Sequence, residues 1–267
     1  MNRLRLLLLL LDICLNMNSS FSSITEFLTG TMLTVDKPPG WTSFDAVNRI
    51  KHFVRKHKLE LTNEQGHKQR FKIGHAGTLD PLATGLLIFC TGKMTTQIDQ
   101  FQAEEKVYTG EIVFGRTTPS YDLETEPVGD ANTDSLHLEL LNNCAVKLTG
   151  NLMQRPPAYS AKHVNGKRAY ISARKGVEIE IPRTPITVYE FEIIEWENPV
   201  ARFRVRCSKG TYIRSLANDI GNLAGTGAYL SALRRTHSGH YSVENAWKME
   251  DLLHHLESLV HGFRRSS

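Results

Sequence analysis

The sequence predicts an α+β fold, and three observations support this prediction. Candidate strands follow one another and are punctuated by helical segments, without the strand–helix–strand rhythm of a doubly wound parallel sheet. One candidate strand, Ala201–Ser208, alternates apolar residues with arginines, as a half-buried strand does. The 267 residues are 40% hydrophobic and 22% charged, an ordinary globular composition that can bury a core without disulfides or metals.

The first elements of the pattern follow Met32. Met32–Val35 predicts a short strand that stops at the prolines before Gly40. A helix is expected from Phe44 to about Lys56, because its apolar residues recur at helical spacing and Ser43 can cap it. Residues 58–70 are polar and charged and are expected to form a loop.

The later elements are predicted from helical spacing and from the two-residue alternation of strands. Residues 117–133 predict an acidic loop, and no internal repeat or low-complexity segment interrupts the pattern. The remaining strands are expected at Leu86–Phe89, Val107–Phe114, Thr187–Glu197 and Ala201–Ser208, and the remaining helices at Leu136–Leu148 and Tyr212–Ala224.

The N-terminal segment does not fit the folded pattern. Its apolar run Leu6–Leu11 is too short to span a bilayer, and no clear small-residue cleavage site follows, as a signal peptide would require. We interpret residues 1–31 as a disordered extension, with Met17 or Met32 as the functional start. Residues 32–245 are expected to form one domain, and residues 246–267 a terminal helix and basic tail.

The charge is distributed unevenly along a chain whose net charge is only +4. Basic residues concentrate in three blocks, 49–72, 155–175 and 202–214, with an acidic stretch at 122–134 between them. Such blocks are typical of surfaces that hold a phosphate backbone. They are equally consistent with three solvated surfaces that never meet.

The four cysteines exclude a zinc site of the usual spacing. They form no CxxC pair and no cysteine–histidine cluster. The sequence therefore predicts a reduced, cytoplasmic protein without a structural metal.

The segment Gly74–Leu87 carries the strongest chemical signal. Two of its glycines allow a tight loop, and Asp80 stands directly before Pro81. An aspartate followed by proline often begins a helix, so Asp80 can be a structural N-cap. A carboxylate at that position is also favoured in its charged form, which a nucleophilic aspartate needs.

The same segment closely resembles the catalytic motif G-H-x-G-x-L-D-P-x-A-x-G of TruB-type pseudouridine synthases. The match is gapless, and further family motifs follow in the right order along the chain. These matching segments are Asp36–Ser43, Lys106–Tyr108, Arg155–Ala161, Cys207–Arg214 and Leu233–Arg235.

The resemblance implies a fold, a reaction and a partner. The expected fold is the pseudouridine-synthase catalytic fold over residues 32–245, a mixed, mostly antiparallel sheet flanked by helices with a central RNA-binding cleft. The expected reaction converts the T-loop uridine of transfer RNA, position 55, to pseudouridine without a cofactor or metal. The expected partner is the T-arm of transfer RNA, bound by a cytoplasmic monomer that needs no protein partner and no membrane.

The resemblance also assigns roles to individual residues. Asp80 would attack the flipped-out nucleotide at its base or its sugar, and Arg214 would pair with Asp80 and help to hold it charged. Tyr108 would stack on the extruded base. The alternatives are a surface cation for Arg214 and a strand core residue for Tyr108.

Three further residues are expected to bind the substrate. Tyr212 and Leu233 would line the uracil pocket, where ordinary packing is the alternative. His75 would contact the RNA or the extruded nucleotide, or else it is a structural histidine. Lys37 is interpreted as a turn residue and is not assigned to the site.

The chain departs from the family pattern in two places. Many relatives continue into a small RNA-binding PUA domain, so this chain is either a short form lacking it or a truncated one. Residues 58–70 are interpreted as a lineage-specific insertion near the RNA. Two other functions are compatible with the sequence: a guide-RNA-dependent synthase, which needs protein partners, and a noncatalytic RNA-binding or RNA-folding protein.

Overall fold

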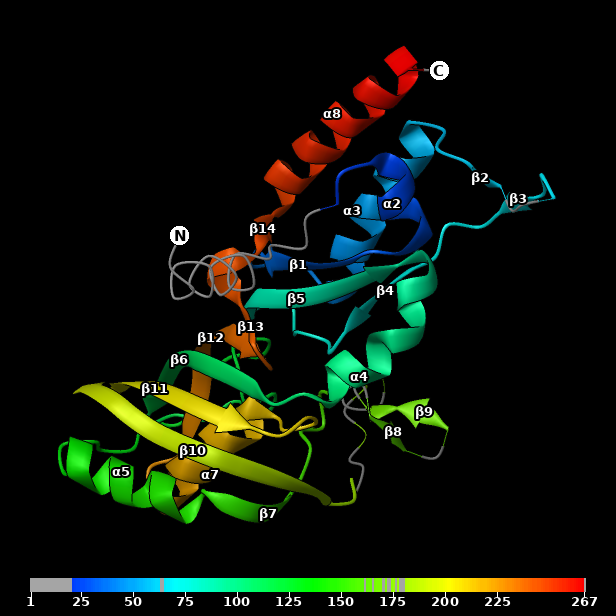
Figure 1. The fold of residues 1–267 in the computed structure, drawn as a ribbon. Helices are drawn as coiled ribbons and strands as arrows, with labels where there is room; N and C mark the ends of the chain where they lie inside the picture. The colour runs from blue at the N-terminus through cyan, green and yellow to red at the C-terminus, as the bar shows by residue number, and fades with distance from the viewer. Residues whose placement is uncertain are drawn as a thin grey trace, which may run out of the picture. The chain divides into compact units, whose positions relative to one another are not determined.

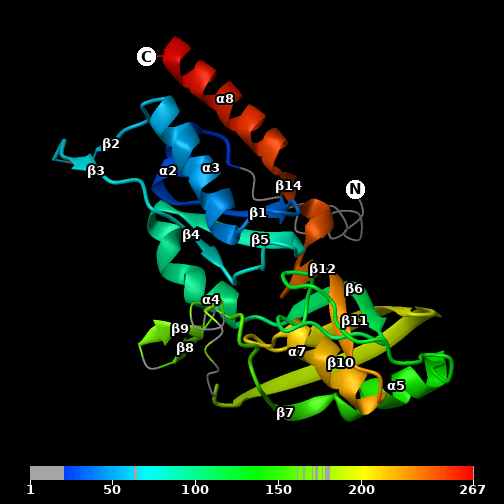
Figure 2. The ribbon, with the colours of Figure 1, turned by 180° about the vertical axis from the view of Figure 1, so that it is seen from behind.

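A computed structural model gives the structure of the protein, drawn in Figures 1 and 2. It describes residues 21–62, 65–160, 162–164, 166–169, 171, 174–175, 177 and 181–266. The chain divides into two compact units. Unit 1 comprises Met1–Ala103 together with Thr236–Ser267, and unit 2 comprises Glu104–Arg235.

Unit 1 is a small mixed sheet covered by helices. Strand β1 (Met32–Lys37) pairs antiparallel with β5 (Thr84–Thr91) and parallel with β14 (Trp247–Lys248), and β4 (Ile73–Ala76) pairs antiparallel with β5. One buried cluster joins β1 and β5 to three helices, so these helices cover one face of the sheet, as Figure 1 shows. They are α2 (Ile24–Gly30), α3 (Ser43–Lys56) and α8 (Met249–Ser266). Unit 1 also contains the short elements η1 (Gly92–Gln97), α4 (Ile98–Ala103), β13 (Tyr241–Ser242) and η2 (Val243–Asn245).

Helix α3 is confirmed, but its cap is Thr42 rather than Ser43. Thr42 and Asp45 form a reciprocal capping box, in which each side chain accepts a hydrogen bond from the other residue's backbone N–H. The hydroxyl of Ser43 is used elsewhere, as described below. The helix buries an apolar stripe and ends at Lys56 with His57 as its C-cap, and Lys58 follows with a positive φ of 52°.

The expectation that the ordered chain begins at Met32 is wrong for residues 21–31, while residues 1–20 lie outside the described residues. Helix α2 buries Phe27 and Leu28 in the unit 1 core. The hydroxyl of Thr91 on β5 accepts a hydrogen bond from the backbone N–H of Thr31 at 2.9 Å and donates to the carbonyl of Phe27 at 2.5 Å. This helix was missed because three buried side chains in seven residues give too short a periodic signal.

Gly92 is expected to be intolerant of a side chain, because the chain passes α2 closely at this residue. A Cβ at this position would lie 2.0 Å from the carbonyl oxygen of Thr29, and its φ is +47°. Gly92→Ala should therefore lower the free energy of unfolding by about 3 kcal/mol. The control is Gly66→Ala, where φ is also positive but nothing lies within 4 Å. Urea unfolding measures both variants. Equal losses of unfolding free energy in Gly92→Ala and Gly66→Ala would contradict the close packing of Gly92 against α2.

Unit 2 contains a mostly antiparallel sheet and the helices α5 and α7. Its strands lie in the order β12, β6, β11, β10, β7, and the contacts of β6 with β11, β11 with β10 and β10 with β7 are antiparallel. Helix α5 packs along β10 and also contacts α7, and Figure 2 shows both helices. The bounds are β6 (Lys106–Phe114), α5 (Leu138–Lys147), β7 (Gly150–Gln154), β10 (Thr184–Glu197), β11 (Val200–Cys207), α7 (Ile213–Leu223) and β12 (Ala228–Ser238).

The predicted α+β class is therefore confirmed, with mostly antiparallel strands and flanking helices. The loop expected at 58–70 instead contains a hairpin of β2 (Leu61–Thr62) and β3 (Lys68–Gln69). A second short hairpin joins β8 (His163–Val164) to β9 (Lys167–Arg168). No helix of the described chain is long and apolar enough to cross a membrane.

Candidate active site

Asp80 lies in a tight turn that leads into β5, and no helix begins at Pro81. The backbone N–H of Ala83 donates to the carbonyl of Asp80 at 3.1 Å, which closes a β-turn with Pro81 in the position that proline favours. The interpretation of Asp80 as a helix N-cap is thus wrong. The charged form of its carboxylate cannot be attributed to a helix dipole.

A buried lysine holds this turn in place. The side chain of Lys37 is fully buried, and its ammonium donates to the carbonyls of Trp41 at 2.6 Å, Pro38 at 2.9 Å and Pro81 at 3.3 Å. The backbone N–H of Gly40 also donates to Pro81 at 2.9 Å. Lys37 therefore ties β1 and its following turn to the turn that carries Asp80. Its interpretation as a turn residue missed this role.

Ser43 makes a second tie to the same turn. Its buried hydroxyl accepts a hydrogen bond from the backbone N–H of Leu79 at 2.9 Å and donates to the carbonyl of Leu79 at 3.2 Å. Leu79 is itself buried and directly precedes Asp80. The first turn of α3 thus fixes the backbone on one side of the carboxylate.

Ser43→Ala is expected to lower kcat about 10-fold and to leave KM within about threefold, because a buried N–H beside Asp80 would lose its acceptor. The control is Thr42→Ala, which should cost about 1 kcal/mol of stability by removing the cap but leave kcat unchanged. Steady-state kinetics and urea unfolding measure both quantities. An equal loss of kcat in the two variants would contradict a positioning role for Ser43.

The candidate residues are distributed over both units. His75 lies on β4 opposite Phe89 of β5, so it belongs to unit 1 with Asp80. The other four belong to unit 2: Tyr108, Tyr212, Arg214 and Leu233. The pairing of Asp80 with Arg214 is therefore a proposal, taken up below.

Arg214 is buried rather than a surface cation. Only 4% of its side chain is exposed, and its guanidinium lies 3.6 Å from the carboxylate of Asp122, which is 8% exposed. It also donates to the carbonyls of Tyr159 at 3.0 Å and Ser120 at 3.3 Å. Because buried charges need partners, these contacts fix the arginine in one position at the start of α7.

The other candidates of unit 2 lie on β6, at the start of α7 and on β12. Tyr212 caps α7, and its backbone exchanges two hydrogen bonds with the side-chain amide of Gln154, at 2.8 and 3.0 Å. Tyr108 is buried on β6 opposite Val205. Leu233 lies half-buried on β12. Gln154 was not predicted, because a lone glutamine carries no distinctive signal.

Lys106, two residues before Tyr108, is a buried cation. Burial lowers the pKa of Lys106 from 10.5 to about 8, and the positive charge of Arg235 is the second-largest cause. Its ammonium donates to the carbonyl of Glu104 at 2.5 Å. Below pH 8 the lysine is charged in both states. Water solvates this charge better in the unfolded chain than the folded interior does.

Lys106→Met should consequently raise the free energy of unfolding by about 1 kcal/mol at pH 7, because the lost hydrogen bond to Glu104 offsets part of the gain. Between pH 8 and 10.5 the unfolded wild-type chain binds more protons than the folded one, so wild-type stability rises with pH and the difference shrinks. Urea unfolding at several pH values measures this. A difference that does not change with pH would contradict the lowered pKa.

The arginines of β11 already have acidic partners. Arg202 pairs with Glu195 at 2.8 Å, and Arg204 pairs with Glu190 at 2.7 Å. The third, Arg206, lies 2.9 Å from Glu105. We therefore do not assign phosphate binding to this part of the basic block 202–214.

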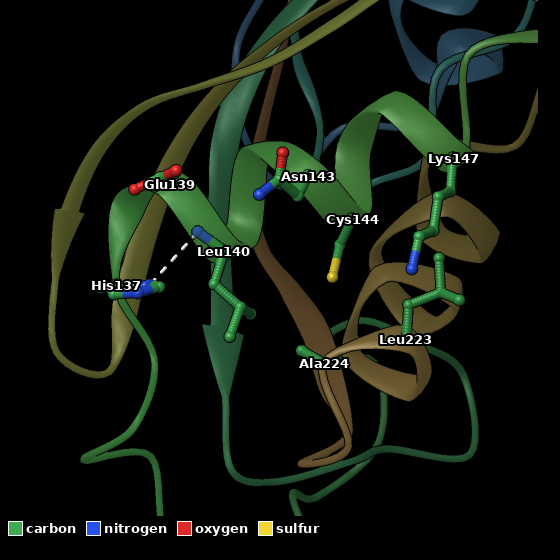
Figure 3. A pocket seen from close by; sticks show the side chains of 8 residues that line it. All are labelled: His137, Glu139, Leu140, Asn143, Cys144, Lys147, Leu223 and Ala224. Carbon is green, nitrogen blue, oxygen red and sulfur yellow. Dashed lines mark hydrogen bonds between the residues drawn. The ribbon is translucent and has the colours of Figure 1, made fainter.

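A cavity of about 390 Å³ lies between α5 and α7 in unit 2. Figure 3 shows Cys144 and Lys147 from α5 and Leu223 from α7 along its wall, with His137 at the start of α5. None of the six candidate residues lines it. In the described ranges no group of three or more His, Cys, Asp or Glu residues is arranged to hold a metal ion.

Comparisons with known proteins agree with the motifs. Residues 64–213 match "TruB family pseudouridylate synthase (N terminal domain)", and residues 214–263 match "tRNA pseudouridylate synthase B C-terminal domain". The chain is 48% identical to tRNA pseudouridine synthase B of Flavobacterium johnsoniae, over 83% of this chain and 93% of that protein. It is 43% identical to the protein of the same name from Parabacteroides distasonis, over 88% and 97% respectively.

Solved structures show a related fold. A Cbf5–Nop10–Gar1 complex contains a chain with 28% identity and a TM-score of 0.61, aligned over 86% of this chain and 55% of that chain. An H/ACA ribonucleoprotein bound to a substrate RNA containing 2′-deoxyuridine gives 26% identity and a TM-score of 0.59, over 86% and 54%. This chain spans about half the length of those two.

The family match covers more than half of the chain, and the sequence relatives align over nearly their whole length. It includes the Gly74–Leu87 motif, whose turn the structure holds with Lys37 and Ser43. The chain belongs to the TruB family of pseudouridylate synthases.

Proposed function

We propose that this enzyme isomerises the T-loop uridine at position 55 of transfer RNA to pseudouridine, with Asp80 as the nucleophile. The observation that carries the proposal is the backbone-clamped turn that presents Asp80 within the family motif. The relatives at 48% and 43% identity are named tRNA pseudouridine synthase B, which supports transfer RNA as the substrate.

The reaction needs the target nucleotide outside its stack. A base buried in an RNA loop must be flipped out before a side chain can reach it, and an aromatic ring can replace the lost stacking. Tyr108 supplies that ring, and Tyr212 and Leu233 line the uracil pocket. His75 contacts the extruded nucleotide.

The chemistry is an internal transfer. Asp80 attacks the base or the sugar, and the bond between ribose C1′ and uracil N1 breaks. C1′ then bonds to uracil C5 and the bond to Asp80 is released, so the carboxylate is regenerated. C5 loses its proton while N1 gains one. Arg214 pairs with the carboxylate and favours its charged form. Because nothing is oxidised, reduced or added, the reaction requires no cofactor.

A guide-RNA-dependent synthase is the second candidate, and the structural likeness to H/ACA assemblies favours it. Those chains are 26% and 28% identical, whereas the sequence relatives reach 48% over 93% of their length. We therefore favour an enzyme that acts on transfer RNA as a monomer, without a protein partner.

Pseudouridine mapping tests this choice. Purified wild-type chain is incubated alone with unmodified, correctly folded transfer RNA, and carbodiimide primer extension locates pseudouridine. Pseudouridine is expected at the T-loop uridine and at no other position. No modification without a guide RNA and added proteins would contradict a stand-alone enzyme.

A further inference from the structure

Helix α3 carries a stripe of side chains that begins at the catalytic turn. Phe44, Asn48, Lys51 and Arg55, here called the α3 stripe, follow one another at spacings of three or four residues and therefore lie on one side of the helix. Phe44 directly follows Ser43, whose hydroxyl binds Leu79 beside Asp80. The stripe extends about 16 Å from this end, at about 1.5 Å per residue.

The first residue of the stripe is an exposed aromatic ring. Phe44 is 61% exposed, although the other apolar residues of α3 are buried. The ammonium of Lys51 lies over this ring, 5.8 Å from its centroid. A ring with neighbouring cations is the combination by which proteins hold unstacked bases and their phosphates.

The cations of the stripe have no acidic partner among the residues that the structure describes. Within the described residues neither Lys51 nor Arg55 forms an ion pair, and the only acidic residue of α3, Asp45, serves the capping box with Thr42. This differs from β11, where three arginines are each paired with glutamates. The β2–β3 hairpin is less suited to bind an anion, because its Lys68 already pairs with Glu60 at 2.6 Å.

We propose that the α3 stripe is a second RNA-contact surface, which binds the substrate RNA beyond its target nucleotide. Phe44 stacks on an unstacked base next to the catalytic turn, and Lys51 and Arg55 bind successive phosphates away from it. This inference rests on the proposed function, because it takes transfer RNA as the bound molecule. The uncompensated positive charge of the stripe fits a polyanion that leads outward from Asp80.

Salt-dependent binding of unmodified transfer RNA tests the proposal. The double variant Lys51→Gln/Arg55→Gln should bind about 10-fold more weakly at about 0.1 M salt, and its slope of log K against log salt should fall by about 2. Phe44→Ala should weaken binding about 10-fold without changing that slope, because a stacking ring carries no charge. All three side chains reach the surface, so folding should persist.

The matched control removes two cations that already have partners. Arg202→Gln/Arg204→Gln should keep the wild-type affinity and slope, and its turnover at saturating RNA should stay within about twofold of the wild type. Equal losses in the stripe and control variants, or an unchanged slope in the stripe variant, would overturn the α3 surface. Failure of the wild-type enzyme to modify transfer RNA would instead refute the proposed function, whatever the binding results.

Discussion

Asp80→Asn is expected to abolish pseudouridine formation, lowering kcat by about 10⁴-fold or more while affinity for transfer RNA stays within about threefold. Asparagine has the same shape but cannot act as a carboxylate nucleophile. The turn itself should persist, because backbone atoms and the side chains of Lys37 and Ser43 hold it. The loss should therefore appear in the chemical step rather than in folding or binding.

Single-turnover assays with excess enzyme measure this step directly. Asp99→Asn is the control, because Asp99 is an exposed carboxylate in the first turn of α4 in the same unit. That variant should react at the wild-type rate. Residual activity of Asp80→Asn within about 10-fold of the wild type would show that another group is the nucleophile.

Arg214→Met is expected to abolish activity and to lower the free energy of unfolding. The substitution leaves Asp122 buried without its guanidinium, and breaking a buried pair by removing one partner typically costs about 3–5 kcal/mol. The carbonyls of Ser120 and Tyr159 also lose a donor. A fall of about 10 °C in Tm should accompany the loss of turnover.

The double variant Arg214→Met/Asp122→Asn separates the two effects. Without the stranded carboxylate, it should recover most of the lost stability and remain inactive, because the arginine that we propose to pair with Asp80 is still missing. Thermal unfolding and single-turnover kinetics on the same samples give both readouts. Activity that returns together with stability would show that Arg214 acts only through the fold.

The sequence predicted the elements with a clear periodicity. Strand β11 alternates Phe203 and Val205 with arginines, and the structure buries the apolar side as expected. Helix α7 was equally clear, since its apolar residues repeat at helical spacing. Strand β12 was missed because charged residues follow Leu233 and hide the alternation. Arg235 is nevertheless almost fully buried, which no pattern of polarity could have predicted.

The sequence proposes the candidate residues but does not predict which other residues hold them in place. The motif identified Asp80, but Asp–Pro suggested a helix start where the chain instead forms a turn into β5. Lys37 holds this turn. It donates a hydrogen bond to Pro81, which lies 44 residues further along the chain, and a local pattern cannot predict such a contact. Arg214 was likewise expected as a candidate, but its partner Asp122 appeared only as part of an acidic loop.

The discontinuity of unit 1 has a consequence for the order of folding. Strand β1 pairs with β14, where Val35 meets Trp247, so this sheet joins two ends of the chain. Unit 2, in contrast, is one uninterrupted segment, Glu104–Arg235. Since contacts between distant residues form slowly and chains emerge from the ribosome N-terminus first, unit 2 should be able to fold during synthesis. Unit 1 is complete only when β14 and α8 have been made, so the sheet that carries the Asp80 turn gains its last strand and helix after unit 2 has been made.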